Sequence, residues 1–405
     1  MNSERAQTWR AIGGFIALYL AIGALSPYLP IYYDSLGLGL DAIGLLAALY
    51  AAAAMIAAPL WGASADRFGS ARPILAIAAA SAAIAAAALA LVTGTLLIAI
   101  AAVALALAMA GIMPILDARA LEVVGAGRSH YAGLRVWGSA SYIVAVVLTG
   151  WVTEWTGIHG MFVVLVPALV ATALVGLGIR SRPGTAPLAQ LTAIGSVLRS
   201  RTLMLFLLVV LLTWTSSTTI NAFFSIHLVD IGAPQSLVGI AWALGAAVEV
   251  PIMIGFPFLV RRMGLNRLLV VGAILFALRA GAIVVTREPL IVTLTMLLHG
   301  GAFALFLVGG VMYISRHAPT GTAATAQGML VAIVFGLAQI VGPGAGGLLA
   351  RELGLQGTFA LAGIGSGLAA MILAWVLRRT APAGRACGCE SVQPWRDSGN
   401  APTRT

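Results

Sequence analysis

The segment GWVTEWTGIHGMF (residues 150–162) returns in altered form as GLLARELGLQGTF (residues 347–359). Four positions are identical at a constant offset of 197 residues: Gly150 and Gly347, Gly157 and Gly354, Gly160 and Gly357, Phe162 and Phe359. A second echo pairs RFGSAR (67–72) with RMGLNR (262–267) at an offset of 195. Two echoes in equivalent places indicate that the chain consists of two related halves.

The composition indicates that these halves lie in the hydrocarbon core of a membrane. Hydrophobic residues make up 60% of the chain and charged residues only 9%, with a mean hydropathy of +1.01, whereas a soluble domain carries about 25% charged residues. Apolar runs near the length of about 20 residues that spans a bilayer as a helix recur along the chain. They lie at 11–33, 43–61, 73–93, 96–118, 134–153, 160–179, 203–226, 238–260, 267–286, 290–314, 326–350 and 357–377.

The runs are rich in Ala, Leu and Gly and show no alternation of polar and apolar residues, which favours helices over a β-barrel. The sequence therefore predicts an all-α membrane protein with twelve transmembrane helices. The predicted organisation is an N-terminal six-helix half (1–179), a linker (180–202), a C-terminal six-helix half (203–378) and a disordered tail (379–405). Two halves related by an axis along the membrane normal are one repeat design of secondary transporters, which place the substrate between the halves near the midplane.

The net charge of +10 comes from 23 arginines and no lysine. If the N-terminus is cytoplasmic, 19 of the 23 fall in the N-terminal segment, the cytoplasmic loops and the C-terminal tail. This asymmetry follows the positive-inside rule and predicts that both termini are cytoplasmic. The same asymmetry accounts for the net positive charge, so nucleic-acid binding is not needed to explain it. Two arginines, Arg135 and Arg279, lie within predicted spans, where an unpartnered charge is costly.

The loop GASADRFGSAR (62–72) resembles the signature of the major facilitator superfamily, with Gly62, Asp66, Arg67, Gly69 and Arg72 in place and Ala71 departing at one basic position. The resemblance implies a gating loop, in which glycines permit a tight turn and the charged residues form a network that breaks as the halves rock. The alternative is a positive loop that only sets topology.

A narrower resemblance covers most of the chain. The stretches that carry it are PYLPIYYDSLGL (27–38), MPILDA (113–118), LRVWGS (134–139), WALGAAVEV (242–250), LHGGAF (298–303) and AQGML (326–330). They look like the phenylpropionate permease and nucleoside:proton symporter branch, which is itself similar to lactose permease. The resemblance implies two pseudo-symmetric six-helix bundles that alternate access, in a bacterial cytoplasmic membrane, as a monomer.

Asp117 and Arg135 stand 18 residues apart on successive predicted helices. The resemblance to lactose permease implies that they hydrogen-bond the substrate and that Tyr142 stands where that family places a stacking tryptophan. An arginine fork, a carboxylate and an aromatic face suit a sugar or an arene. The alternative is a structural ion pair whose side chains reach the cytoplasmic surface.

The C-terminal half holds a second set of ionisable residues. Arg279 has no charged neighbour in sequence, and Glu249 in the preceding span is its expected partner, because pairing lowers the cost of burying both. The resemblance ties Arg279 and His299 to proton coupling, although Ala302 stands where lactose permease has the glutamate thought to carry the proton. Glu249 either switches between a protonated and an Arg279-paired state, or forms a permanent structural pair; His299 either titrates or packs.

Two further candidates for substrate binding have weaker support: Asn221, at the end of TWTSSTTIN (213–221), and Trp242. Each has an ordinary structural alternative, in helix-to-helix hydrogen bonds or in packing.

The function classes follow from these residues. The five histidines are scattered, with no H-E-x-x-H, and no nucleophile elbow or phosphate-binding loop is present, so neither an enzyme nor an ATP-driven pump is expected. We expect no cofactor, no metal, and no partner other than the bilayer and a small-molecule substrate. The leading prediction is proton-coupled symport of an aromatic acid, nucleoside or sugar; the alternative is proton-antiport drug efflux.

Overall fold

The computed structural model describes residues 2–67, 71–124, 128–178, 192–319 and 321–380. Most of the predicted linker and tail therefore lie outside the described residues. The elements are α1 (Asn2–Leu25), α2 (Leu29–Ser35), α3 (Leu40–Arg67), α4 (Ala71–Leu91), α5 (Thr95–Met109), α6 (Ile112–Val124), α7 (Arg128–Thr156), η1 (Ile158–Gly160), α8 (Met161–Gly178), α9 (Thr192–Arg199), α10 (Arg201–Asp230), α11 (Gln235–Met263), α12 (Leu265–Val285), α13 (Pro289–His317), α14 (Ala323–Ala332), η2 (Ile333–Leu337) and α15 (Ala338–Thr380).

The predicted spans are present as helices. In the described part of the chain, eleven helical stretches are long and apolar enough to cross a membrane. The last of them runs from Ala323 to Leu377 over 55 residues and contains two of the twelve predicted spans. Its two parts meet at Gly354, where the backbone is non-helical (φ 70°, ψ 172°). The all-helical membrane fold with two sets of spans is confirmed.

The sequence repeat is also a repeat of backbone conformation. Gly157 and Gly354, which match at the offset of 197, both have positive φ, at 80° and 70°. Gly37 and Gly232, 195 residues apart, have φ of 77° and 91°. Positive φ is strained for residues with a Cβ, so glycine at these turns is a requirement of the backbone.

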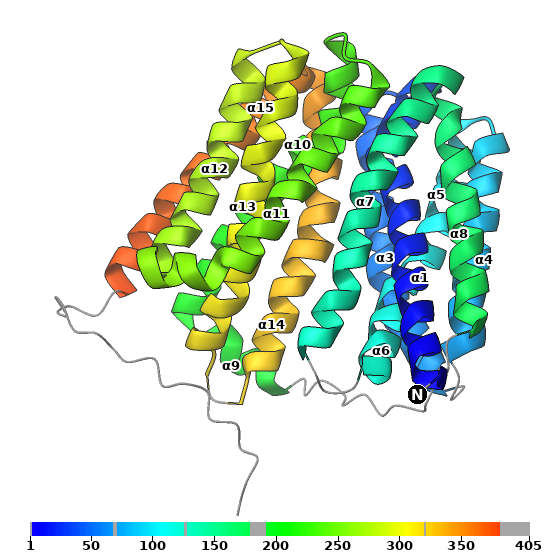
Figure 1. Ribbon diagram of the computed structural model, residues 1–405. Helices are drawn as coiled ribbons and strands as arrows, with labels where there is room; N and C mark the ends of the chain where they lie inside the picture. Colours follow the sequence, from blue (N-terminus) through cyan, green and yellow to red (C-terminus); the bar gives the residue numbers. More distant parts are fainter. Residues whose placement is uncertain (1, 68–70, 125–127, 179–191, 320, 381–405) are drawn as a thin grey trace, which may run out of the picture.

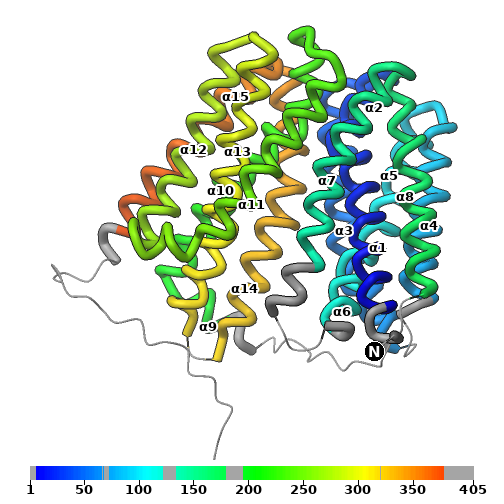
Figure 2. Tube along the Cα trace, in the orientation of Figure 1, coloured from blue at the N-terminus to red at the C-terminus, as the bar shows by residue number. Residues whose placement is uncertain are grey.

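The helices form two bundles that stand side by side (Figure 1). In the N-terminal bundle α1 packs on α7 and α8, and α4 on α5 and α8; in the C-terminal bundle α15 packs on α10 and α12, and α13 on α11 and α12. The bundles meet mainly where α7 packs on α11 and α3 on α15. Figure 2 traces the same path from the N-terminal bundle to the C-terminal one.

The bundles touch most closely at the end opposite the N-terminus. A Cβ on Gly44 of α3 would clash with the Pro343 carbonyl oxygen of α15, and a Cβ on Gly239 of α11 with the Val146 carbonyl oxygen of α7. Glycine at these points lets helix backbones approach closely, as is common between membrane helices.

Polar contacts join the bundles at the same end. Arg351 donates to the Asp41 carboxylate over 3.0 Å. The Glu154 carboxylate accepts from the Ser236 amide over 3.1 Å, at the N-terminus of α11, where the helix dipole favours an anion. The two bundles are therefore closed against each other at this end.

The Gly239 contact gives a direct test of this closure. Gly239→Ala is expected to lower the free energy of unfolding by about 1–3 kcal/mol, because overpacking forces two helix backbones apart. Thermal unfolding of the purified protein measures it. The matched control is Gly255→Ala on the same helix, where an added Cβ meets nothing within 4 Å; equal melting temperatures for the two variants would contradict the close approach.

Candidate functional site

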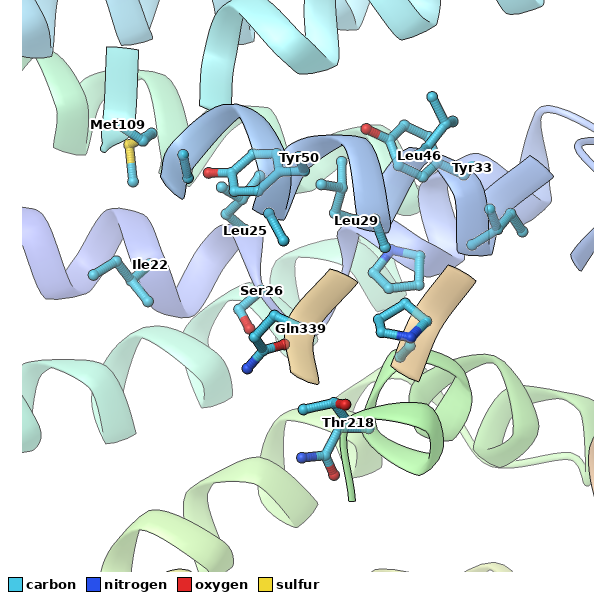
Figure 3. A pocket seen from close by; sticks show the side chains of 18 of the residues that line it. Ile22, Leu25, Ser26, Leu29, Tyr33, Leu46, Tyr50, Met109, Thr218 and Gln339 are labelled. Carbon is cyan, nitrogen blue, oxygen red and sulfur yellow. The ribbon is translucent and has the colours of Figure 1, made fainter. Parts of the chain in front are cut away.

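A cavity of about 460 Å³ lies between the bundles, lined from α1, α2, α3 and α5 on one side and α10, α11, η2 and α15 on the other. Figure 3 shows Tyr50, Leu46 and Met109 on one side of it, and Gln339 and Thr218 on the other. The described lining residues are mainly apolar and include no formally charged side chain. The polar and aromatic ones are Ser26, Tyr33, Tyr50, Thr218, Asn221, Trp242, Phe335 and Gln339.

Three interruptions of helical geometry border the cavity. The first predicted span is broken between α1 and α2 at residues 26–28, where the prolines of SPYLP prevent a continuous helix. The fourth predicted span is broken at residues 110–111, between α5 and α6, directly after the lining residue Met109. The third interruption is the π-helical turn η2, which carries Phe335 and is followed by Gln339. Non-helical backbone at membrane depth is tolerated where it lines a cavity, and π-turns are frequent at functional sites.

Trp242 of α11 lines the cavity. Its indole N–H donates to the Ser225 hydroxyl over 3.1 Å, and its ring meets Phe224 edge-on with centroids 6.3 Å apart. Because the N–H is already engaged, a solute meets the aromatic surface, which suits a flat or apolar face.

Arg279 is the most deeply buried cation of the described residues, at 1% exposure. Its Nη1 donates to Asn221 Oδ1 over 2.8 Å and lies 3.0 Å from His299 Nδ1. Its Nη2 donates to Met296 Sδ over 3.3 Å, and the guanidinium stands 5.2 Å from the centre of the Phe224 ring. None of these partners is an acid, and Nε has no hydrogen-bond partner among the described residues.

The contact with His299 fixes the state of that ring. A guanidinium has donors and no acceptor, so Nδ1 of His299 accepts and the ring proton is on Nε2. His299 is therefore neutral in this conformation, as a hydrogen-bonded residue of the C-terminal core, between Phe276 and Phe303.

The structure does not bring Glu249 to Arg279. Glu249 is half-buried on α11, within electrostatic range of Tyr142 on α7, and forms no ion pair with any described residue. The reason is the helix arrangement: α12, which carries Arg279, packs mainly on α13 and α15, while α11 packs on α13 and α7. The expected pair is absent from this conformation, and Asn221 takes its place.

Asp117 and Arg135 do meet. Arg135 Nη1 lies 3.5 Å from Asp117 Oδ2, and its Nη2 donates to the Tyr19 hydroxyl over 3.3 Å. The two side chains are 46% and 25% exposed and are not part of the cavity lining. Exposed ion pairs contribute at most about 1 kcal/mol to stability, so stability alone gives little reason for this pair.

The predicted gating loop is described only in part. Gly62 is on α3 with open space around it, and Arg67 is exposed at the end of α3. Gly69 lies outside the described residues, and so do the side chains of Asp66 and Arg72. Their gating role stays a prediction.

Sequence reasoning missed several cavity residues: Ser26, Tyr33, Tyr50, Phe335 and Gln339. Tyr50 had a usable signal, as the lone aromatic residue within the alanine-rich run LLAALYAAAAM. Ser26 lies within the proline break, directly before Pro27. Nothing in the sequence signals the π-turn that brings Phe335 and Gln339 to the cavity.

Membrane-spanning helices in two bundles with a cavity between them are the architecture of a multi-pass membrane transporter of small solutes. Residues 9–361 match the model of the MFS_1 like family, and the chain belongs to this branch of the major facilitator superfamily.

Two relatives and one solved structure illustrate the likeness. The maltose permease of Geobacillus stearothermophilus is 26% identical over 325 residues, covering 80% of this chain and 82% of the permease. The protein of Escherichia coli (strain K12) named "Probable 3-phenylpropionic acid transporter" is 25% identical over 315 residues, covering 76% of this chain and 82% of that protein. The crystal structure of the nucleoside transporter NupG superposes with a TM-score of 0.79 at 18% identity, covering 93% of this chain and all of NupG. This last likeness shows the fold alone.

Asp117→Asn separates the two roles of the exposed ion pair. We expect the free energy of unfolding to fall by less than about 1 kcal/mol, while solute affinity falls by about tenfold, because one carboxylate acceptor becomes an amide donor and the negative charge beside Arg135 is lost. Melting temperature and solute-induced stabilisation measure the two effects. Glu288→Gln, which removes a charge outside the described cavity, is the control; unchanged solute affinity in Asp117→Asn would leave only the structural role.

Proposed function

We propose that this protein is a secondary active transporter that moves a small, uncharged, ring-containing polar solute, such as a nucleoside or sugar, by proton symport. Both termini face the cytoplasm of a bacterial cell, and the protein works as a monomer in the cytoplasmic membrane. The halves 1–179 and 203–378 rock about the linker, and the cavity communicates with the cytoplasm in this conformation.

The uncharged lining of the cavity is the observation that carries this proposal. Amides and hydroxyls from both bundles supply hydrogen bonds, and Tyr50 and Trp242 supply aromatic surface. An anionic solute would be left without an opposite charge in the described lining, at a cost that an uncharged solute avoids. Aromatic acids therefore become the less favoured substrates. The relationship to a maltose permease supports the sugar class.

Glu249 is our candidate for the proton carrier. It lies in the span of α11, half-buried, next to the bundle interface with α7, and no described cation pairs with it. A carboxylate without a cation partner in an apolar setting is favoured in its protonated form and releases the proton when water reaches it. Movement of α7 against α11 changes that access. In this proposal Arg279 and His299 support the cavity wall and do not carry the proton.

Asp117 and Arg135 keep a proposed role in solute passage. Both residues lie between the cavity and the proposed cytoplasmic ends of α6 and α7. The half-exposed Arg135 guanidinium and Asp117 carboxylate can therefore bind a solute as it leaves the cavity. Tyr142, two helical turns beyond Arg135 on α7, lies within electrostatic range of Glu249 and adds an aromatic group on that helix.

Transport into proteoliposomes by the purified protein tests the proposal. A proton gradient with the lower pH on the side of the proposed external face is expected to drive accumulation of uridine or maltose by the wild-type protein. Glu249→Gln is expected to lose this accumulation while retaining gradient-independent exchange of the same solute, because an uncharged side chain binds no proton at this step. Asp34→Asn, another carboxylate without an ion-pair partner among the described residues, is the control; gradient-driven accumulation by Glu249→Gln would contradict the assignment.

Proton antiport is the second candidate, since a mainly apolar cavity and a carboxylate with no ion-pair partner among the described residues also suit a lipophilic cation. Tetraphenylphosphonium distinguishes the two. If the protein exchanges tetraphenylphosphonium for protons and takes up neither uridine nor maltose, drug efflux by antiport replaces symport as the function.

A further inference from the structure

The hydrogen bond between Arg279 and Asn221 fixes which way the Asn221 amide faces. Arginine only donates hydrogen bonds, so the group 2.8 Å from its Nη1 is the carbonyl oxygen of the amide. A rotated amide would place two donors against each other beside a buried cation. The orientation therefore follows from the chemistry of Arg279.

What remains of Asn221 for the cavity is its amide nitrogen. Asn221 lines the cavity, and its Nδ2 has no partner among the described residues. It is also absent from the polar atoms that are buried without a partner. A hydrogen bond from a cation polarises the amide and strengthens the N–H groups at its other end. Asn221 thus offers a fixed and strengthened donor.

The neighbouring polar groups of the same wall do not share this property. The Trp242 N–H is engaged by Ser225, and the Thr218 hydroxyl donates to the Ala338 carbonyl over 2.8 Å. Gln339 has an amide without a described partner, which can rotate to donate or to accept. Of these wall groups, Asn221 alone has its polarity imposed by a buried charge.

We infer that Arg279 is a positioning residue that makes Asn221 a donor-only subsite, so that the C-terminal wall selects solutes presenting a carbonyl, ring or hydroxyl oxygen or a ring nitrogen as acceptor. Groups that only donate, such as ammonium, are rejected there. This inference rests on the proposed solute role of the cavity. It gives the buried, acid-free Arg279 a function in specificity, in place of the proton coupling that the sequence suggested.

Asn221→Asp is the most direct test, since it keeps the acceptor for Arg279 and removes the donor to the cavity. Binding of uridine and maltose, measured by calorimetry on the purified protein, is expected to weaken by about tenfold or more, because the solute acceptor then faces a carboxylate. The melting temperature is expected to hold or rise, because the buried cation gains an acid partner. Weaker binding together with better stability is a result that a purely structural role would not give.

The control is Gln339→Glu, the same amide-to-acid exchange on the same wall without a cation behind it. It is expected to lose stability where Asn221→Asp does not. Arg279→Lys, which keeps a charged donor, is expected to retain most of the uridine or maltose affinity, and Arg279→Met to lose it. Glucosamine, whose ammonium group only donates, is expected to bind Asn221→Asp better than the wild type.

The outcomes separate this inference from the function on which it rests. Wild-type binding of uridine or maltose that persists unchanged in Asn221→Asp or Arg279→Met would overturn the inference and leave the transport proposal standing. Absence of wild-type binding to either solute would overturn the proposed function and this inference with it.

Discussion

The structure depends on one constraint: backbone N–H and C=O groups in hydrocarbon must be hydrogen-bonded within the protein. Long continuous helices satisfy it almost everywhere in the described chain. The exceptions within the described spans are the break after α1, the turn between α5 and α6, and the π-turn η2. Each adjoins residues that line the cavity between the bundles, where solute or water can satisfy the freed groups. The location of irregular backbone thus marks the same site as the polar side chains do.

A second constraint is the energetic cost of the buried charge of Arg279. An arginine at 1% exposure with amide, imidazole and thioether partners is costly to keep, and no described acid offsets the cost. Its contacts nevertheless impose states on their partners. His299 is held neutral, and Asn221 is held with its donors outward. The charge therefore acts through its neighbours on what the cavity can bind.

Most of the fold could be predicted from the sequence. Apolar runs predicted the helices, and the echo of Gly157 at Gly354 predicted two related halves; the backbone has positive φ at both glycines. The resemblance of residues 62–72 to the superfamily signature correctly predicted the family. The ion pair of Asp117 and Arg135 was also predictable, since the two lie on helices that follow each other in the chain.

Two features of the site depend on packing that the sequence does not encode locally. The separation of Glu249 from Arg279 could not be predicted, because which faces of α11 and α12 meet depends on how the whole bundle packs. The direction of Gln339 depends on the π-turn that precedes it, and no residue pattern in that segment distinguishes a π-turn from an ordinary helical turn.

The central claim is that the cavity between the bundles holds the transported solute and is open to the cytoplasm. Cysteine labelling at Ser26 tests it most directly, because the natural cysteines, Cys387 and Cys389, can both be replaced by serine. A membrane-impermeant maleimide applied from the cytoplasmic side should label Ser26→Cys, and uridine or maltose should slow the reaction. Labelling that is absent, or unaffected by either solute, would contradict the account.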